Sequence, residues 1–307
     1  MKKYSIILSV VIIALASCQK NATGVKLPPA KIQLVVQSFI SPQDSLIKVN
    51  VSESTPIFGQ TQQNNLGSST LLDAKVEITH NSVIYNLLYD AKELAYIIDS
   101  NHLKIIAGET YSIKVTRGSE TVTANCTVPF AVPFDLSLDK IELKAEIDPQ
   151  SKDTLTKYYR LTTSFTDQPS PSDYYRLYIN SNSTTWEYLY NNQGGIIDSV
   201  LSSHPNFTSF EKEEQEYVTD VDQNGQRIFQ NSTIYLGTSS ISNIVSSEIT
   251  LGIMHTDINY YKYHTSALAH LNNQGNPFAE PSLVFTNIQG GLGIFAAYNY
   301  RYWTKNL

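Results

Sequence analysis

The chain has 307 residues, of which 41% are hydrophobic and 16% are charged, a composition typical of a globular protein that excludes a disordered one. Its formal net charge is −6, with 28 acidic against 22 basic side chains, which argues against a nucleic-acid partner and against a basic membrane-surface patch. Its 20 tyrosines and 11 phenylalanines favour β-sheet.

The first eighteen residues have the three parts of a secretory signal. Lys2 and Lys3 give a positive start, an apolar run over 6–15 is too short to span a bilayer, and Leu-Ala-Ser precedes Cys18. This ending resembles the lipobox of bacterial lipoproteins, which implies cleavage before Cys18 and acylation of that cysteine. Two or more acyl chains give stable anchoring. We therefore predict a signal peptide over residues 1–17 and lipidation at Cys18. The alternative is a plain secretory signal in which Cys18 is incidental.

Residues 18–31 are small, polar and proline-bearing, and we interpret them as a tether between the lipid and the folded part. From Ile32 onward, short extended runs alternate with turn residues. Predicted strands cover 32–40, 46–51, 74–78, 83–88, 110–116 and 121–128. About seven short strands with turns every 8–12 residues are typical of an immunoglobulin-like β-sandwich, which we assign to residues 32–130. Cys126 then lies in a strand as a small buried residue and not as a nucleophile.

Pro129 and Pro133 mark a boundary, because neither residue fits in a central strand. Residues 131–307 are predicted to form a larger antiparallel β domain with one short helix, so the fold class is mainly β. Asp257 can cap this helix. The apolar residues on one face of the helix are Ile258, Tyr261, Leu268 and Leu271. Strands follow at 282–288 and 294–298, and the glycines of 290–293 between them permit a positive φ or a close approach of strands.

One stretch matches the start of a calcium-binding loop. Asp220, Asp222 and Asn224 place side-chain oxygens at positions 1, 3 and 5, and Gly225 follows at the bend. Position 12 requires a carboxylate, but Asn231 occupies it. The flanking residues alternate as strands do, so a hairpin turn of the Asn-Gly kind explains the same residues. We therefore expect either no cofactor and an ordinary turn, or calcium at Asp220, Asp222 and Asn224.

Local signatures of catalysis are missing from the sequence. The six histidines form no His-Glu-x-x-His pattern for zinc, and no Gly-x-Ser-x-Gly motif marks a nucleophilic serine. We expect that the protein is not an enzyme. Carboxylates that the fold alone brings together leave no signature, so a hydrolase stays open as an alternative.

Aromatic residues are dense between Tyr158 and Trp303. One interpretation is ordinary packing of tyrosine on the faces of antiparallel strands. The other is a recognition surface, because Tyr and Trp give a large contact area at low entropy cost.

Several segments resemble a known family of lipoproteins. They are 35–42, 73–76, 108–111, 124–129, 276–281 (Asn-Pro-Phe-Ala-Glu-Pro) and 286–295 (Thr-Asn-Ile-Gln-Gly-Gly-Leu-Gly-Ile-Phe). Over about residues 32–298 the chain is similar to the family known as domain of unknown function 4249, from the Bacteroidota. The resemblance implies a lipoprotein of the outer membrane whose gene lies beside TonB-dependent transporters. The resemblance implies no catalytic residue in this sequence.

These observations predict a non-catalytic accessory protein. Its lipid anchor would hold it in the outer membrane, on either face, beside a TonB-dependent barrel for which it captures or caps a ligand. A surface adhesion or structural module without a transporter is the alternative. The candidate docking residues are Asn276, Pro277, Phe278, Glu280 and Asn287. The other interpretation of this C-terminal motif is that its apolar side chains belong to the core.

Overall fold

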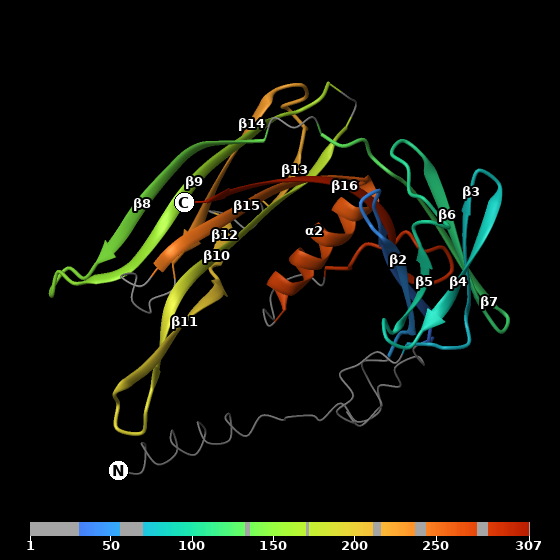
Figure 1. Ribbon diagram of the computed structural model, residues 1–307. Helices are drawn as coiled ribbons and strands as arrows, with labels where there is room; N and C mark the ends of the chain where they lie inside the picture. Colours follow the sequence, from blue (N-terminus) through green and yellow to red (C-terminus); the bar gives the residue numbers. More distant parts are fainter. Residues whose placement is uncertain are drawn as a thin grey trace, which may run out of the picture.

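Strands build most of the molecule, in two connected halves (Figure 1). The computed structural model describes residues 31–55, 70–132, 136–169, 172–210, 216–236, 244–274 and 282–306. The mainly β fold class with one short helix is thereby confirmed. The predicted signal peptide, Cys18 and the tether up to residue 30 lie outside the described residues. So do four of the docking candidates, namely Asn276, Pro277, Phe278 and Glu280.

The first half is a sandwich-like array of seven strands. They are β1 (Leu34–Ile40), β2 (Leu46–Glu53), β3 (Lys75–His80), β4 (Val83–Asp90), β5 (Ala95–Asp99), β6 (Thr110–Arg117) and β7 (Glu120–Thr127). Their hydrogen-bonded order is β1-β2-β5-β4-β3-β6-β7. Every second residue of β6 is buried from Tyr111 to Val115, as expected for a strand with one face on a core. Cys126 is buried in this core, and burial raises the pKa of its thiol, which confirms the packing interpretation.

The second half is a sandwich of two sheets. One contains β11 (Ile196–Pro205), β10 (Tyr174–Tyr190), β15 (Ile244–Thr256) and β16 (Leu292–Asn306), with β13 (Tyr217–Thr219) beside β10. The other has the order β12 (Phe207–Phe210), β14 (Arg227–Tyr235), β9 (Thr154–Thr166) and β8 (Ser137–Ile147). Side chains from both sheets interdigitate in one core that includes Leu161, Phe165, Tyr175, Ile234 and Ile253.

The last strand joins the two halves, and it is the dark red ribbon in Figure 1. Residues 292–297 of β16 pair in parallel with β1, whereas residues 298–306 pair antiparallel with β15. Ile288 and Phe295 consequently belong to the first core, although they lie far beyond residue 130. The assignment of residues 32–130 and 131–307 to separate domains stays a prediction, because β16 contributes to both halves.

The predicted helix is α2 (Ile258–Asn273), and the Asp257 carboxylate caps it by accepting a hydrogen bond from the Tyr260 amide. Its buried face differs from the predicted one. Tyr260 is buried against Phe39, whereas Ile258 and Leu271 are 40% and 60% exposed. Aromatic rings from β1, β13 and β16 surround this side of the helix, so rings pack there in place of aliphatic side chains.

Candidate functional site

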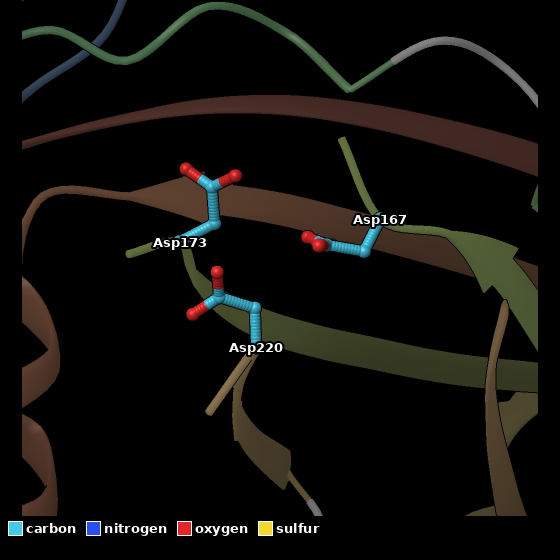
Figure 2. A group of neighbouring side chains, drawn as sticks. All are labelled: Asp167, Asp173 and Asp220. Carbon is cyan, nitrogen blue, oxygen red and sulfur yellow. The ribbon is translucent and has the colours of Figure 1, made fainter. Parts of the chain in front are cut away.

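Three buried aspartates meet where three strands begin or end (Figure 2). Asp167 directly follows β9, Asp173 directly precedes β10, and Asp220 directly follows β13. They are 2%, 6% and 3% exposed, and one carboxylate oxygen of each lies within 4.8 Å of those of the other two. Figure 2 shows the three side chains side by side, with the Asp167 carboxyl group directed toward Asp173 and Asp220. Because β9 belongs to one sheet and β10 and β13 to the other, this aspartate cluster lies at the junction of the two sheets.

Neutral donors fix Asp167 in place. Its carboxylate accepts hydrogen bonds from the Tyr175 hydroxyl and from the Gly225 amide, the latter at 2.7 Å. Its own amide donates to the Gln226 carbonyl at 2.9 Å. Burial raises the pKa of Tyr175, so the phenol keeps its proton and remains a donor at neutral pH.

Asp173 contacts the one histidine at the cluster. The Nε2 atom of His255 lies 3.0 Å from Oδ1 of Asp173, and its Nδ1 atom lies 2.8 Å from the Phe130 carbonyl oxygen. A carbonyl oxygen only accepts, so Nδ1 carries a proton. The Nε2 atom of the same ring faces the Asp173 carboxylate. His255 therefore connects the cluster to the segment that follows the first half of the chain.

Asp220 is the member of the cluster that the sequence singled out. Its amide donates to the Asp173 carbonyl at 3.2 Å, and its carbonyl accepts from Gln223 at 2.8 Å. Asp222 and Asn224 are exposed in the turn that follows, with Asp222 at φ +70° and Gly225 at φ +71°. The structure thus brings Asp220 together with Asp167 and Asp173, and it leaves Asp222 outside that group.

Sequence analysis missed Asp167 and Asp173 as site residues. They begin and end a loop with two prolines, which predicts a turn and nothing more. Their one distinguishing signal is a position next to the extended runs 158–166 and 174–180, whose patterns are typical of strands. That signal does not tell which strand ends meet in the folded chain.

A second feature is a groove on the outer face of β10, β15 and β16. Tyr178, Gly252 and Tyr302 are directly opposite one another in adjacent strands, so their side chains would share one face of the sheet. Gly252 has no side chain, and the groove of about 330 Å³ lies between its neighbours. Tyr302 stacks on Tyr300 with ring centroids 6.3 Å apart. Tyr178 and Tyr302 are 42% and 61% exposed.

Beyond Thr185, β11 is the one partner of β10 among the residues that the structure describes, and the two strands form an arm (yellow, lower left in Figure 1). Its exposed large apolar residues are Trp186, Tyr188, Leu189, Tyr190, Ile196, Ile197, Val200 and Leu201. Residues 182–205 contain no lysine or arginine. Strand alternation places Trp186 and Tyr188 on the same face of β10 as Tyr178. We call these two residues, with Tyr178, Tyr300 and Tyr302, the aromatic face.

The described part of the C-terminal motif is tied to the rest of the fold. Asn287 donates to the Phe295 carbonyl at 2.7 Å and accepts from the Phe295 amide at 3.0 Å. Ile288 and Phe295 are buried, whereas Leu283 is 89% exposed. The predicted strand over 282–288 is wrong. Its backbone groups bond to side chains instead of a neighbouring strand, as where the Phe285 amide donates to Ser266 Oγ.

The family described as "Domain of unknown function (DUF4249)" matches residues 23–302. The chain belongs to this family. The search of curated proteins returned no match. Among solved structures, the B domain of a biofilm associated protein has 7% identity and a TM-score of 0.14, and the match covers 88% of this chain and 85% of that one. The BSP domain of a biofilm associated protein has 6% identity and a TM-score of 0.15, with 89% and 58% covered. These two values are too low to transfer a fold or function to this DUF4249 protein.

Within the described residues of this DUF4249 protein, no helix is both long enough and apolar enough to cross a membrane.

Proposed function

We propose that this DUF4249 protein is a lipid-anchored, non-catalytic accessory of an outer-membrane transporter. The observation that carries the proposal is the aromatic face with its projecting arm. All Trp and Tyr side chains of the aromatic face except Tyr300 are 41–61% exposed and provide contact area that the fold does not use internally. Such residues are enriched at protein interfaces, where they supply most of the binding energy.

The arm is suited to a protein partner for a second reason. Among the described residues, the part of β10 beyond its pairing with β15 forms a two-stranded ribbon with β11. β11 is the outer strand of its sheet. An outer strand presents backbone groups that pair with a strand of another chain. The arm also lacks lysine and arginine, so attraction to anionic lipid contributes little to its contacts. A transporter barrel offers the extended backbone and aromatic girdle that would match such a surface.

The anchor supports the same proposal by concentrating the protein in the plane of the membrane. A lipid on Cys18 would keep the arm near a barrel at a high effective concentration, so even a modest interface would be occupied. Replacement of Cys18 by serine is expected to release the protein from the membrane fraction and to abolish incorporation of labelled palmitate. Membrane retention in the Cys18→Ser variant would contradict the lipid anchor.

The partner is tested by capture from detergent-solubilised outer membranes with a tag at the C-terminus. The double variant Trp186→Ser/Tyr188→Ser is expected to lower recovery of a TonB-dependent barrel by at least tenfold. The matched control is Leu143→Ser/Ile147→Ser on β8, where the side chains are 55% and 54% exposed. Unchanged recovery in the arm variant would remove the arm from the interface. Recovery of no barrel by the wild-type protein would contradict the transporter role.

A further inference from the structure

The aspartate cluster carries negative charge that its described neighbours only partly offset. We propose that Asp167, Asp173 and Asp220 together bind one calcium ion. This site differs from the calcium loop that the sequence suggested. It shares Asp220 with that loop, but its other two ligands are Asp167 and Asp173 in place of Asp222 and Asn224. The inference is independent of the transporter role.

The observation that points to a ligand is the state of Asp220. This side chain is 97% buried, and one of its carboxylate oxygens lies within 4.8 Å of an oxygen of each of the other two carboxylates. Yet the structure gives its carboxylate no hydrogen bond and no ion pair with any residue of the described ranges. A buried carboxylate without a partner is costly, and two further carboxylates within 4.8 Å add repulsion. A cation between the three groups would remove both penalties.

The other contacts leave room for such an ion. Asp167 receives only neutral donors, the Tyr175 hydroxyl and the Gly225 amide, so its negative charge is solvated but not neutralised. His255 supplies at most one positive charge, at Asp173. None of these contacts places a second cation at the cluster, and a divalent cation would offset the negative charge of the three carboxylates.

The donor set favours calcium, and the spacing of the oxygens is compatible with it. All three groups offer hard carboxylate oxygens, which suit Ca²⁺ and Mg²⁺, whereas Zn²⁺ prefers His and Cys ligands. Calcium–oxygen bonds of 2.3–2.6 Å allow two ligand oxygens to stand up to about 5 Å apart, and the three carboxylate oxygens lie within 4.8 Å of one another. Magnesium demands near-ideal octahedral geometry and usually keeps several waters, whereas calcium accepts more oxygen ligands in a flexible arrangement.

Binding would fasten three strand ends that belong to two sheets. Through His255 and the Phe130 carbonyl it would also fasten the segment after the first half of the chain. We therefore expect calcium to stabilise the second sandwich.

The first test uses the purified full chain after removal of metal with EDTA. Calorimetric titration with Ca²⁺ up to about 1 mM, the weak end of protein calcium sites, is expected to give about one ion per chain and a higher Tm. Terbium is expected to bind with luminescence sensitised by excitation of tyrosine, since Tyr175 contacts Asp167, and calcium should displace it. A folded wild-type protein without binding heat or a Tm shift in this range would overturn the proposal. Equal affinity for Mg²⁺ would overturn the assignment to calcium.

The second test compares Asp220→Asn with Asp222→Asn, its matched control in the exposed turn. In EDTA, Asp220→Asn is expected to raise Tm, because it removes a repelling charge, and in calcium it should lose the calcium-induced rise and bind at least tenfold more weakly. The Asp222→Asn variant should behave as wild type. An equal loss of affinity in both variants would place the ion at the turn. A lower Tm for Asp220→Asn in EDTA would show a structural carboxylate and would overturn the proposal.

Discussion

Gly293 lies against the backbone of Val36, its register partner in the parallel pairing of β16 with β1. A Cβ atom on Gly293 would collide with the Val36 carbonyl oxygen, and the backbone at Gly293 has φ +106°. Gly293, the second residue of β16, is therefore required at this position. It lets the end of the chain approach the first strand closely enough to complete the first core.

Replacement of Gly293 by alanine is expected to destabilise the protein by about 3 kcal/mol, because a close approach and a positive φ are both violated. Urea unfolding followed by fluorescence measures the change. The control is Gly118→Ala in the turn between β6 and β7, where φ is +56° and no atom lies within 4 Å of the added Cβ. This control should cost only about 1–2 kcal/mol. Equal losses in the two variants would show that the contact with Val36 is unimportant.

His264 on α2 is surrounded by the rings of Phe39, Tyr217 and Tyr260. Burial, aided by the positive charge of Arg176, lowers its pKa to about 4. In the unfolded chain the pKa of a histidine is about 6.5. Between about pH 4 and pH 6.5 the unfolded chain therefore binds a proton at His264 that the folded state does not bind. The contribution of the neutral His264 ring to the free energy of unfolding is fully present above about pH 6.5 and is lost as the pH falls toward 4.

His264→Phe is expected to reduce the loss of stability between pH 7 and pH 4 by about 1–3 kcal/mol. Denaturant unfolding at the two pH values measures it. The control His102→Gln alters an exposed histidine, and its loss of unfolding free energy between pH 7 and pH 4 should equal that of the wild type. An unchanged slope in His264→Phe would contradict the predicted neutral state of the ring.

Asp257, the N-cap of α2, titrates in the opposite sense. Burial raises its pKa to about 7, although hydrogen bonds from the Tyr260 amide and other donors act to lower it. A carboxyl group whose pKa is higher in the folded state stabilises fully below its unfolded pKa of about 3.9, and this contribution is lost as the pH rises through 7.

Asp257→Asn keeps a capping oxygen without the titration, since asparagine is an equally good N-cap. The Tm of the variant minus the Tm of the wild type should therefore be larger at pH 8 than at pH 5. The increase should be about 2–4 °C for each kcal/mol of unfolding free energy that the wild type loses between the two pH values. Thermal melts at both pH values measure the gain. A variant that loses Tm equally at both values would show that the negative charge itself is needed at the helix end.

The sequence alone determined the features whose causes lie within a few residues. Strands were predicted over 74–78 and 83–88, and β3 and β4 form there, with Asn81 and Ser82 at φ +47° and +66° in the turn between them. The alternation in β6 and the Asp257 cap follow from the same short-range rules. So do the glycines at 290 and 293, which have the predicted positive φ.

Only the tertiary structure decided which of these local pieces meet. Strands β1 and β16 pair across more than 250 residues, and Asp167, Asp173 and Asp220 converge from three strand ends. Asn287, expected as a docking residue, holds the backbone of Phe295. Strand pairing depends on the packing of whole sheets, and a local pattern is satisfied equally by many pairings. For that reason the sequence pointed to Asp220 but could not show which carboxylates lie beside it.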